Sequence, residues 1–315
     1  IIGGKNDKNI DVLSIIRQEK IPTEFSKQTK KELLFIGDEV GEDELIGRTD
    51  LSELFTVTID GRDSKDFDDA ISIEKNGDNY DLYVHIADVS HYVKRHTALD
   101  DDAYERGNST YLYNIVIPML PEKLSNGICS LNPGEIRLAI TAKMTIDKKG
   151  KVVNNNFYES FIKSDKRLVY DDVNDFLEGD NDIYDDEILK EKLRLFNELY
   201  KILRKSRENR GSIDFNFEES QIDVSETGKV LNIEALERGP GNKMIEEFML
   251  IANETVASLF AYMDFPFIYR IHEKPSEEKL DGFKRALNAM GYNIKGKDLH
   301  PKDFQNILKE VEGKK

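Results

Sequence analysis

The sequence predicts an α+β fold in which a mixed, largely antiparallel sheet is flanked by helices. Two observations support this. Alternating β-rich runs come in pairs around short turn sequences, and helical patterns come in blocks. Strands that alternated one by one with helices would instead indicate a doubly wound parallel sheet. The 315 residues suffice for one large domain or two ordinary ones.

The first strands lie in the first third of the chain. Phe55 to Asp60 alternates as a half-buried strand does, and a polar loop follows it. Residues 70–74 and 80–86 flank Asn76-Gly77-Asp78, and Asn-Gly between alternating runs is a strong hairpin signal. A helix is expected over 99–106, behind Thr97.

The remaining elements are read in the same way. A second hairpin is expected over residues 137–146 and 152–162, and a long amphipathic helix over 185–208. After it we expect, in order, a hairpin around 227–229, a helix over about 243–263, a short strand at 267–271 and two helices.

Composition narrows the class of protein. The net charge of −16 argues by itself against a nucleic-acid binder. The charge is uneven, however: acids crowd at 171–187, whereas Lys and Arg recur at 163–167 and 201–210, which is compatible with a local basic groove. Cys129 is the single cysteine, so no intrachain disulfide can form, which suits a reducing compartment. Without a signal peptide or a membrane-spanning run, we expect a cytoplasmic protein with no membrane partner.

The most informative segment is D-G-R-D-S-K-D-F-D-D-A at 60–70. Clustered carboxylates repel one another unless a cation neutralises them, and hard divalent ions favour such oxygen ligands. Two magnesium ions can clamp the attacking and leaving oxygens of a phosphoryl displacement. The alternative is a solvated acidic turn, which the flanking hydrophobic strands and the apolar Phe67 disfavour. An EF-hand fits poorly, because Lys65 stands where its loop glycine belongs.

This segment, with its neighbours, resembles the catalytic signature of the ribonuclease II/ribonuclease R family. Further matches follow in family order: H-I-A-D-V-S-H-Y-V (85–93), R-G-N-S-T-Y (106–111), I-P-M-L-P (117–121), L-S-N-G-I-C-S-L (124–131) and Y-R-I-H-E-K-P (269–275). The wording of the motifs is nearer ribonuclease R. The resemblance implies an RNB-type catalytic domain over 51–315, C-terminally truncated, behind a 1–50 linker from an upstream cold-shock-type barrel.

The resemblance implies a 3′→5′ exoribonuclease that hydrolyses RNA processively to nucleoside 5′-monophosphates with two magnesium ions. The family's four active-site aspartates fall on Asp60, Asp66, Asp68 and Asp69, as metal ligands and catalytic residues. Asp60 and Asp69 are expected to be ligands, and Asp66 a ligand or its support. Loss of Asp68 is expected to harm the chemistry most. Asp63 lies in the motif but matches none of the four.

Four residues are expected to hold RNA. Tyr111 and Phe215 match the family's aromatic clamp around the terminal bases, and Tyr170 is a further stacking candidate. Aromatic residues in β-type sequence are more often core, which is the alternative for each. Glu246, rather than Glu247, is expected to bind the terminal ribose, whose 2′-hydroxyl distinguishes RNA from DNA. The alternative is an acid that stabilises a helix N-terminus.

The family's later motif T-S-P-I-R-[KR]-Y, whose arginine contacts phosphate, does not occur here, and neither do the flanking RNA-binding barrels. We therefore expect a fragment of low activity with some uncovered apolar surface, cut from a monomeric parent. Its expected partner is the 3′ end of single-stranded RNA, with the ribosome or the RNA-decay machinery as further candidates. The competing hypothesis is a non-catalytic RNA-binding or regulatory module that keeps the fold.

Overall fold

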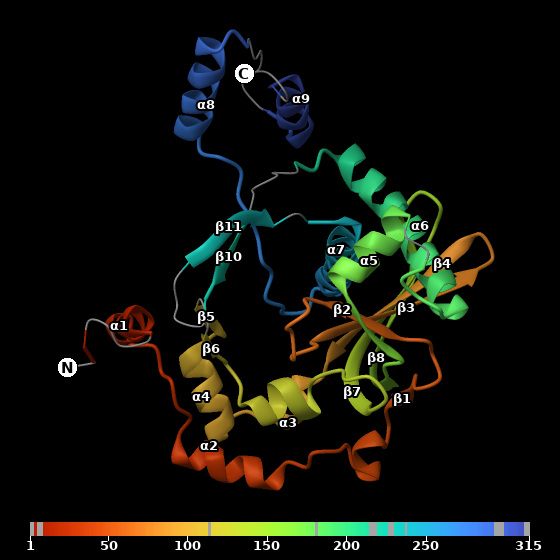
Figure 1. Ribbon diagram of the computed structural model, residues 1–315. Coiled ribbons are helices and arrows are strands. Elements are labelled where there is room, and N and C mark those ends of the chain that lie inside the picture. Colours follow the sequence, from red (N-terminus) through yellow and green to blue (C-terminus); the bar gives the residue numbers. More distant parts are fainter. Residues whose placement is uncertain are drawn as a thin grey trace.

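The fold is built on one seven-stranded sheet with helices on its faces (Figure 1). The computed structural model describes residues 3–4, 9–112, 115–179, 182–213, 219–225, 230–236, 238–292 and 299–311. The strand order is β1-β8-β7-β4-β3-β2-β9. Only the pairs β1–β8 and β2–β9 are parallel, so the predicted α+β class with a largely antiparallel mixed sheet is confirmed. The strands are β1 (Thr49–Asp50), β2 (Val57–Asp60), β3 (Asp69–Asn76), β4 (Asn79–Ala87), β7 (Ile136–Ile146), β8 (Val152–Lys163) and β9 (Lys166–Val169).

Two long hairpins form the centre of the sheet. β3 and β4 pair from Asp69↔Ile86 to Asn76↔Asn79, around the Asn-Gly turn that the sequence predicts. Gly77 has φ +58°, a left-handed conformation that glycine adopts at little cost. β7 and β8 form the second predicted hairpin, and β7 also pairs with β4 along its length. The hairpins therefore join side by side into a single sheet.

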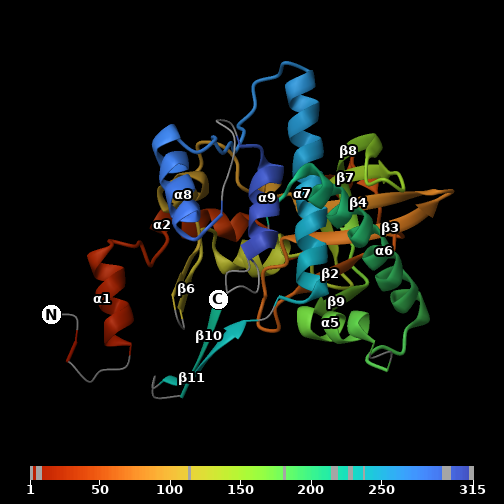
Figure 2. The same ribbon diagram turned by 90° about the horizontal axis from the view of Figure 1, so that it is seen from above.

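Three helices cover one face of this sheet: α5 (Tyr170–Glu178), α6 (Glu187–Arg210) and α7 (Pro240–Tyr262) (Figures 1 and 2). The apolar stripe of α6 is buried, as its periodicity predicts, at Leu189, Leu193, Phe196, Leu199 and Leu203. Phe196 meets Phe248 of α7 with ring centres 5.7 Å apart. Burying a side chain of this size contributes roughly 1.5–3 kcal/mol, so this layer supplies much of the core's stability.

The N-terminal residues run along the edge of the domain. They form α1 (Ile10–Gln18), α2 (Lys27–Glu32) and two 3₁₀ turns (Leu33–Phe35 and Glu42–Leu45). Glu32 accepts hydrogen bonds from the amides of Ala98 and Leu99 at the start of α4 (Ala98–Arg106), the helix expected behind Thr97. Arg48 pairs with buried Asp88 at 2.6 Å. Segment 26–50 is thus attached to the domain at several points, and its role as a linker stays a prediction.

Smaller elements lie beside α4. They are α3 (Val89–Tyr92), the hairpin of β5 (Thr110–Leu112) and β6 (Ile115–Ile117), and the π-type turn η3 (Lys123–Ile128). Side chains from η3, α4 and the sheet form a second apolar cluster that includes Phe67, Leu99, Leu124 and Leu131. Because Phe67 belongs to the loop between β2 and β3, this cluster anchors that loop to the domain.

The C-terminal third contains one wrong prediction. A hairpin forms from β10 (Glu219–Val224) and β11 (Val230–Leu236), and α8 (Glu277–Ala289) and α9 (Pro301–Val311) follow as predicted. Residues 267–271, expected as a strand, have no regular structure. A strand needs a partner edge for its hydrogen bonds, and none is paired with this segment among the described residues. Ile268 is instead 94% exposed, and Phe267 stacks on Phe260 with ring centres 4.5 Å apart.

A chain of buried polar side chains crosses the sheet from strand to strand. Thr56 and Ser72 share a hydrogen bond of 2.7 Å, and Ser72 contacts His85 Nε2 at 3.0 Å. His85 Nδ1 contacts Thr141 Oγ1 at 2.7 Å, and Thr141 contacts Ser160 at 2.7 Å. All five residues are fully buried. Because each has its partner, the chain ties neighbouring strands together without leaving a polar group unsatisfied.

Among the described residues, no helix is long and apolar enough to cross a membrane.

Candidate active site

The four motif aspartates come together where β2 ends and β3 begins. Asp60 is the last residue of β2, and Asp69 is the first of β3. These strands are antiparallel neighbours, with Val57 opposite Ile71. The chain leaves Asp60, makes a loop and returns beside it, which brings Asp66 and Asp68 back toward Asp60. The predicted cluster therefore exists in space as well as in sequence.

Burial and mutual repulsion raise the pKa values of Asp60, Asp68 and Asp69. Burial raises the pKa of Asp60 to about 7, and the negative charge of Asp69 is the second cause of the rise. Burial and the neighbouring Asp68 raise the pKa of Asp69 to about 6. The pKa of Asp68 is also raised, by burial and then by Asp66. Groups held in this way gain from a nearby cation, because a cation favours their charged form.

One atom in the cluster points to the kind of cation that would fit. Asp60 Oδ2 is buried and has no hydrogen-bond partner among the described residues. A buried carboxylate oxygen without a donor is costly, and an oxygen-seeking ion such as magnesium would satisfy it. Within the described residues, no group of three or more His, Cys, Asp or Glu side chains is arranged so that it could hold a metal ion by itself. Magnesium is usually held by one or two carboxylates, waters and substrate phosphates, so the open cluster suits it.

The loop that carries the aspartates is anchored by the motif at 124–131. The buried ring of Phe67 fixes its middle, and the Phe67 amide donates to Ser130 Oγ at 3.0 Å. Ser130 Oγ in turn donates to the Lys65 carbonyl at 3.0 Å, and the Leu131 amide donates to the Phe67 carbonyl. Sequence reasoning missed Ser130. Its signal was the motif L-S-N-G-I-C-S-L, whose contact with the loop only the fold reveals.

Tyr111 stands at the mouth of the site. It lies on β5 and is 68% exposed, so it is not the core residue of the alternative interpretation. Partial burial raises the pKa of Tyr111, and the charges of Asp66 and Asp68 raise it further. The phenol therefore lies next to the acidic loop. A cleft of about 550 Å³ is lined by loop residues 61–66 and, across from them, by Ser109, Tyr111 and Asn126.

Two other candidate aromatics differ in outcome. Tyr170, at the start of α5, is half-buried, and burial together with Asp60 and Asp69 raises its pKa to about 12. The fold thus brings Tyr170 near Asp60 and Asp69, whereas Tyr111 lies near Asp66 and Asp68. Phe215 lies outside the described residues.

Glu246 lies on α7 within a cluster of arginines. Its carboxylate is 2.9 Å from Arg238 and 3.5 Å from Arg207, so it serves as an ion-pair partner and does not cap the helix. Glu247, next to it, is 3% exposed and accepts from Arg207 Nε at 2.8 Å and Arg204 at 3.3 Å. The two glutamates thus face different surroundings, and Glu246 is the one with accessible surface.

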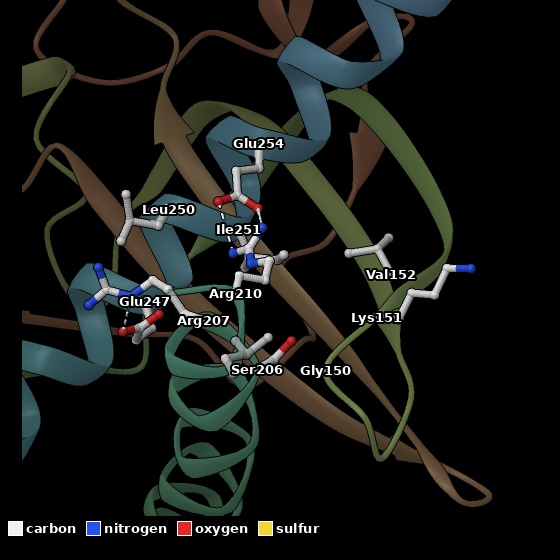
Figure 3. A pocket seen from close by; sticks show the side chains of 11 residues that line it. Gly150, Lys151, Val152, Ser206, Arg207, Arg210, Glu247, Leu250, Ile251 and Glu254 are labelled. Carbon is white, nitrogen blue, oxygen red and sulfur yellow. Dashed lines mark hydrogen bonds and ion pairs between the residues drawn. The ribbon is translucent and has the colours of Figure 1, made fainter. Parts of the chain in front are cut away.

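Glu247 also lines a separate pocket, of about 250 Å³, between α6, α7 and the turn from β7 to β8 (Figure 3). Arg207 points to Glu247, and Arg210 pairs with Glu254 on its rim at 2.9 Å (Figure 3). None of the motif aspartates lines it. Arg207 and Arg210 are paired with Glu247 and Glu254 across it, so we interpret it as a polar contact between α6 and α7.

Comparison with known proteins finds relatives of one family over nearly the whole chain. Residues 48–315 match the RNB domain family. Ribonuclease R of Thermotoga maritima is 46% identical over 99% of this chain and 44% of its own length, and ribonuclease R 1 of Lactococcus lactis is 43% identical over 99% and 39%. The solved Mycoplasma genitalium RNase R in complex with ribose methylated single-stranded RNA superposes with a TM-score of 0.93 at 30% identity, over 99% of this chain and 49% of that one. The chain thus spans less than half the length of these relatives.

Proposed function

The chain belongs to the RNB domain family, and we propose that it forms the catalytic part of a 3′→5′ exoribonuclease. The reaction is hydrolysis of RNA, one nucleotide at a time from the 3′ end, to nucleoside 5′-monophosphates. The observation that carries the proposal is the cluster of Asp60, Asp66, Asp68 and Asp69 where β2 ends and β3 begins, in which the pKa of Asp60 is raised to about 7 and that of Asp69 to about 6. Relatives named ribonuclease R at 46% and 43% identity support the same reaction class.

Magnesium is the cation we propose for the cluster, as two ions. Asp60 and Asp69 would hold it, with Asp66 as a ligand or its support, and its charge would offset the charge that develops on the scissile phosphate. The unpartnered oxygen of Asp60 and the raised pKa values of Asp60 and Asp69 support this role.

The chain's own residues would bind and orient the strand. Exposed Tyr111, above the cleft of about 550 Å³, is placed to stack on a base, which is worth roughly 1–3 kcal/mol per base. Tyr170, near Asp60 and Asp69, is a further stacking candidate. Glu246 is proposed to accept from the ribose 2′-hydroxyl. Phe215 stays a candidate for the second half of the aromatic clamp. These contacts do not depend on which base is bound. An enzyme that degrades RNA of any sequence requires contacts of this kind.

The full protein is proposed to act as a cytoplasmic monomer on the 3′ ends of single-stranded RNA. Two solved structures of M. genitalium RNase R, with single-stranded and with double-stranded RNA, support RNA as the ligand class. Association with the ribosome or the RNA-decay machinery is a further proposal.

The decisive experiment compares Asp68→Asn with Asp63→Asn in the full-length protein. Both changes remove one negative charge from the same loop, but only Asp68 is one of the four motif aspartates. With 5′-labelled single-stranded RNA in magnesium, we expect Asp68→Asn to abolish nucleotide release while RNA affinity stays close to wild type. Asp63→Asn should keep most of the turnover.

Near-normal turnover in Asp68→Asn would refute the assignment. The competing hypothesis, a non-catalytic RNA-binding module, predicts that the wild-type protein binds RNA without shortening it at any magnesium concentration. A cluster kept for binding alone would gain nothing from four carboxylates that lie close enough to repel one another, three of them with raised pKa values, which is why the catalytic proposal is preferred.

A further inference from the structure

Arg167 makes an unusual set of contacts beside the acidic cluster. It lies on β9, which runs parallel to β2 with Arg167 opposite Thr58. Its Nη2 donates to two successive backbone carbonyls, of Gly61 at 2.8 Å and Arg62 at 2.6 Å. Its guanidinium also lies 5.5 Å from the ring centre of Phe67. One side chain thus reaches the first two residues of the loop and its apolar anchor.

Within the described residues, the same side chain does not pair with Asp60, whose carboxyl group is close enough to be influenced by its charge. Arginine commonly forks onto a carboxylate with two parallel hydrogen bonds. No ion pair within 4.0 Å joins Arg167 to Asp60 among the described residues, although the arginine is near enough to oppose the rise in the pKa of Asp60. Asp60 Oδ2 therefore remains buried and free of a donor. Its Nη2 is used on the backbone instead, whereas its Nε is buried and has no hydrogen-bond partner among the described residues.

We propose that Arg167 is a positioning residue for the metal-binding face of the acidic loop. By holding the carbonyls of Gly61 and Arg62, it fixes the direction in which the chain leaves Asp60. That direction sets where the returning residues Asp66 to Asp69 stand relative to Asp60. The planar guanidinium suits this task, because its donors keep fixed directions that a lysine ammonium does not. The inference rests on the proposed function, which supplies the metal.

Some side chains do not touch the metal but hold its ligands in place. Removing one of them typically lowers metal affinity or activity by about 10–100-fold. Arg167→Met removes the donors and the charge while keeping a long apolar stem. Arg167→Lys keeps the charge but not the planar fork. The matched control is Lys166→Met, which removes one positive charge from the neighbouring position of the same strand. Lys166 points to the other face, as strand neighbours do, and pairs with Asp186 at 3.4 Å.

The first measurement is the Kd for Mn²⁺, read from the electron paramagnetic resonance signal of the free ion, on the 315-residue chain without RNA. Circular dichroism confirms that each variant is folded. We expect Arg167→Met to weaken Mn²⁺ binding about 10–100-fold and Arg167→Lys by an intermediate factor. Lys166→Met should stay within about twofold of wild type, as an ordinary surface substitution does.

The second measurement is limited proteolysis with trypsin, which needs no metal. Cleavage after Arg62 and Lys65 reports how often the loop opens. Loss of two hydrogen bonds should speed cleavage at these sites roughly tenfold in Arg167→Met, and little in Lys166→Met. A residue that only stabilises β9 would change overall unfolding without selecting these two sites.

The outcomes separate the two proposals. Wild-type chain that binds Mn²⁺, loses it in Asp60→Asn and keeps it unchanged in folded Arg167→Met would overturn the role of Arg167 and leave the proposed function standing. If Arg167→Met does not fold, a wild-type Kd in Arg167→Lys overturns it equally. Wild-type chain that binds no Mn²⁺, or binding that Asp60→Asn leaves intact, would refute the proposed metal chemistry and this inference together.

Discussion

His85 offers a quantitative test of the buried polar chain that ties the strands of the site together. It is fully buried on β4, between Ser72 and Thr141, and it pairs across to Ala70, the neighbour of Asp69. Burial lowers the pKa of His85 to about 3. The perturbation we propose is a change of pH, with His85→Gln as the variant that cannot titrate.

The direction and size follow from linkage. In the unfolded chain the imidazole has an ordinary pKa of about 6.5, so below that pH the unfolded state takes up a proton that the folded state refuses. Stability is therefore complete above pH 6.5 and is lost as the pH falls toward 3. At 1.36 kcal/mol per unit, His85 alone lowers the free energy of unfolding by about 2 kcal/mol between pH 8 and pH 5.

The assay measures the free energy of unfolding by urea for wild type and His85→Gln at pH 5, 6, 7 and 8, with a metal chelator in the buffer. Other titrating groups act equally in both proteins, so the difference in free energy between them isolates His85. We expect His85→Gln to be less stable than wild type at pH 8, by roughly 1–3 kcal/mol, because its amide fits the two hydroxyl groups imperfectly. That deficit should shrink by about 2 kcal/mol at pH 5. A deficit that stays constant with pH would mean that His85 takes up its proton equally in the folded and the unfolded state. Its pKa would then not be lowered by burial, and the reasoning would fail.

Three further predictions concern the site and its supports. Tyr111→Ala should change the length of the shortest undegraded RNA, seen on a sequencing gel, because a stacking residue near the cut decides when a short oligomer dissociates; an unchanged ladder would remove Tyr111 from the RNA path. Glu247→Ala should lower the free energy of unfolding by about 3–5 kcal/mol, because it leaves Arg204 and Arg207 without their buried partner; denaturant titration beside Glu254→Ala, an exposed pair, provides the control. The 315-residue chain should release nucleotides far more slowly than the full-length protein, at least about 10²-fold, if an arginine outside this sequence stabilises the phosphate; equal processive rates at equal concentration and low salt would show that the site is complete here.

Local sequence patterns were enough to predict the hairpins, the long helix and the acidic loop. Alternating runs around Asn76-Gly77-Asp78 predicted the β3–β4 hairpin, and the apolar stripe of α6 predicted its buried face. These patterns could be read because their cause is local: a turn, a strand or a helix face is set by residues close together in the chain. The spacing of the aspartates was likewise informative, since Asp60 and Asp69 border one loop.

Tertiary structure alone decided which distant residues support that loop. Arg167 contacts the acidic loop because β9 lies beside β2. Ser130 contacts the loop because the segment that follows η3 packs against Phe67. A wrong prediction has the same origin: residues 267–271 have strand composition, but β-structure needs a partner edge, which local sequence cannot specify. The resemblance predicted Glu246 as the residue that binds the terminal ribose, yet its pairing with Arg207 and Arg238 depends on how α7 lies against α6. Local propensity acts over a few residues, whereas hydrogen bonds and ion pairs join groups that only the folded chain brings within reach.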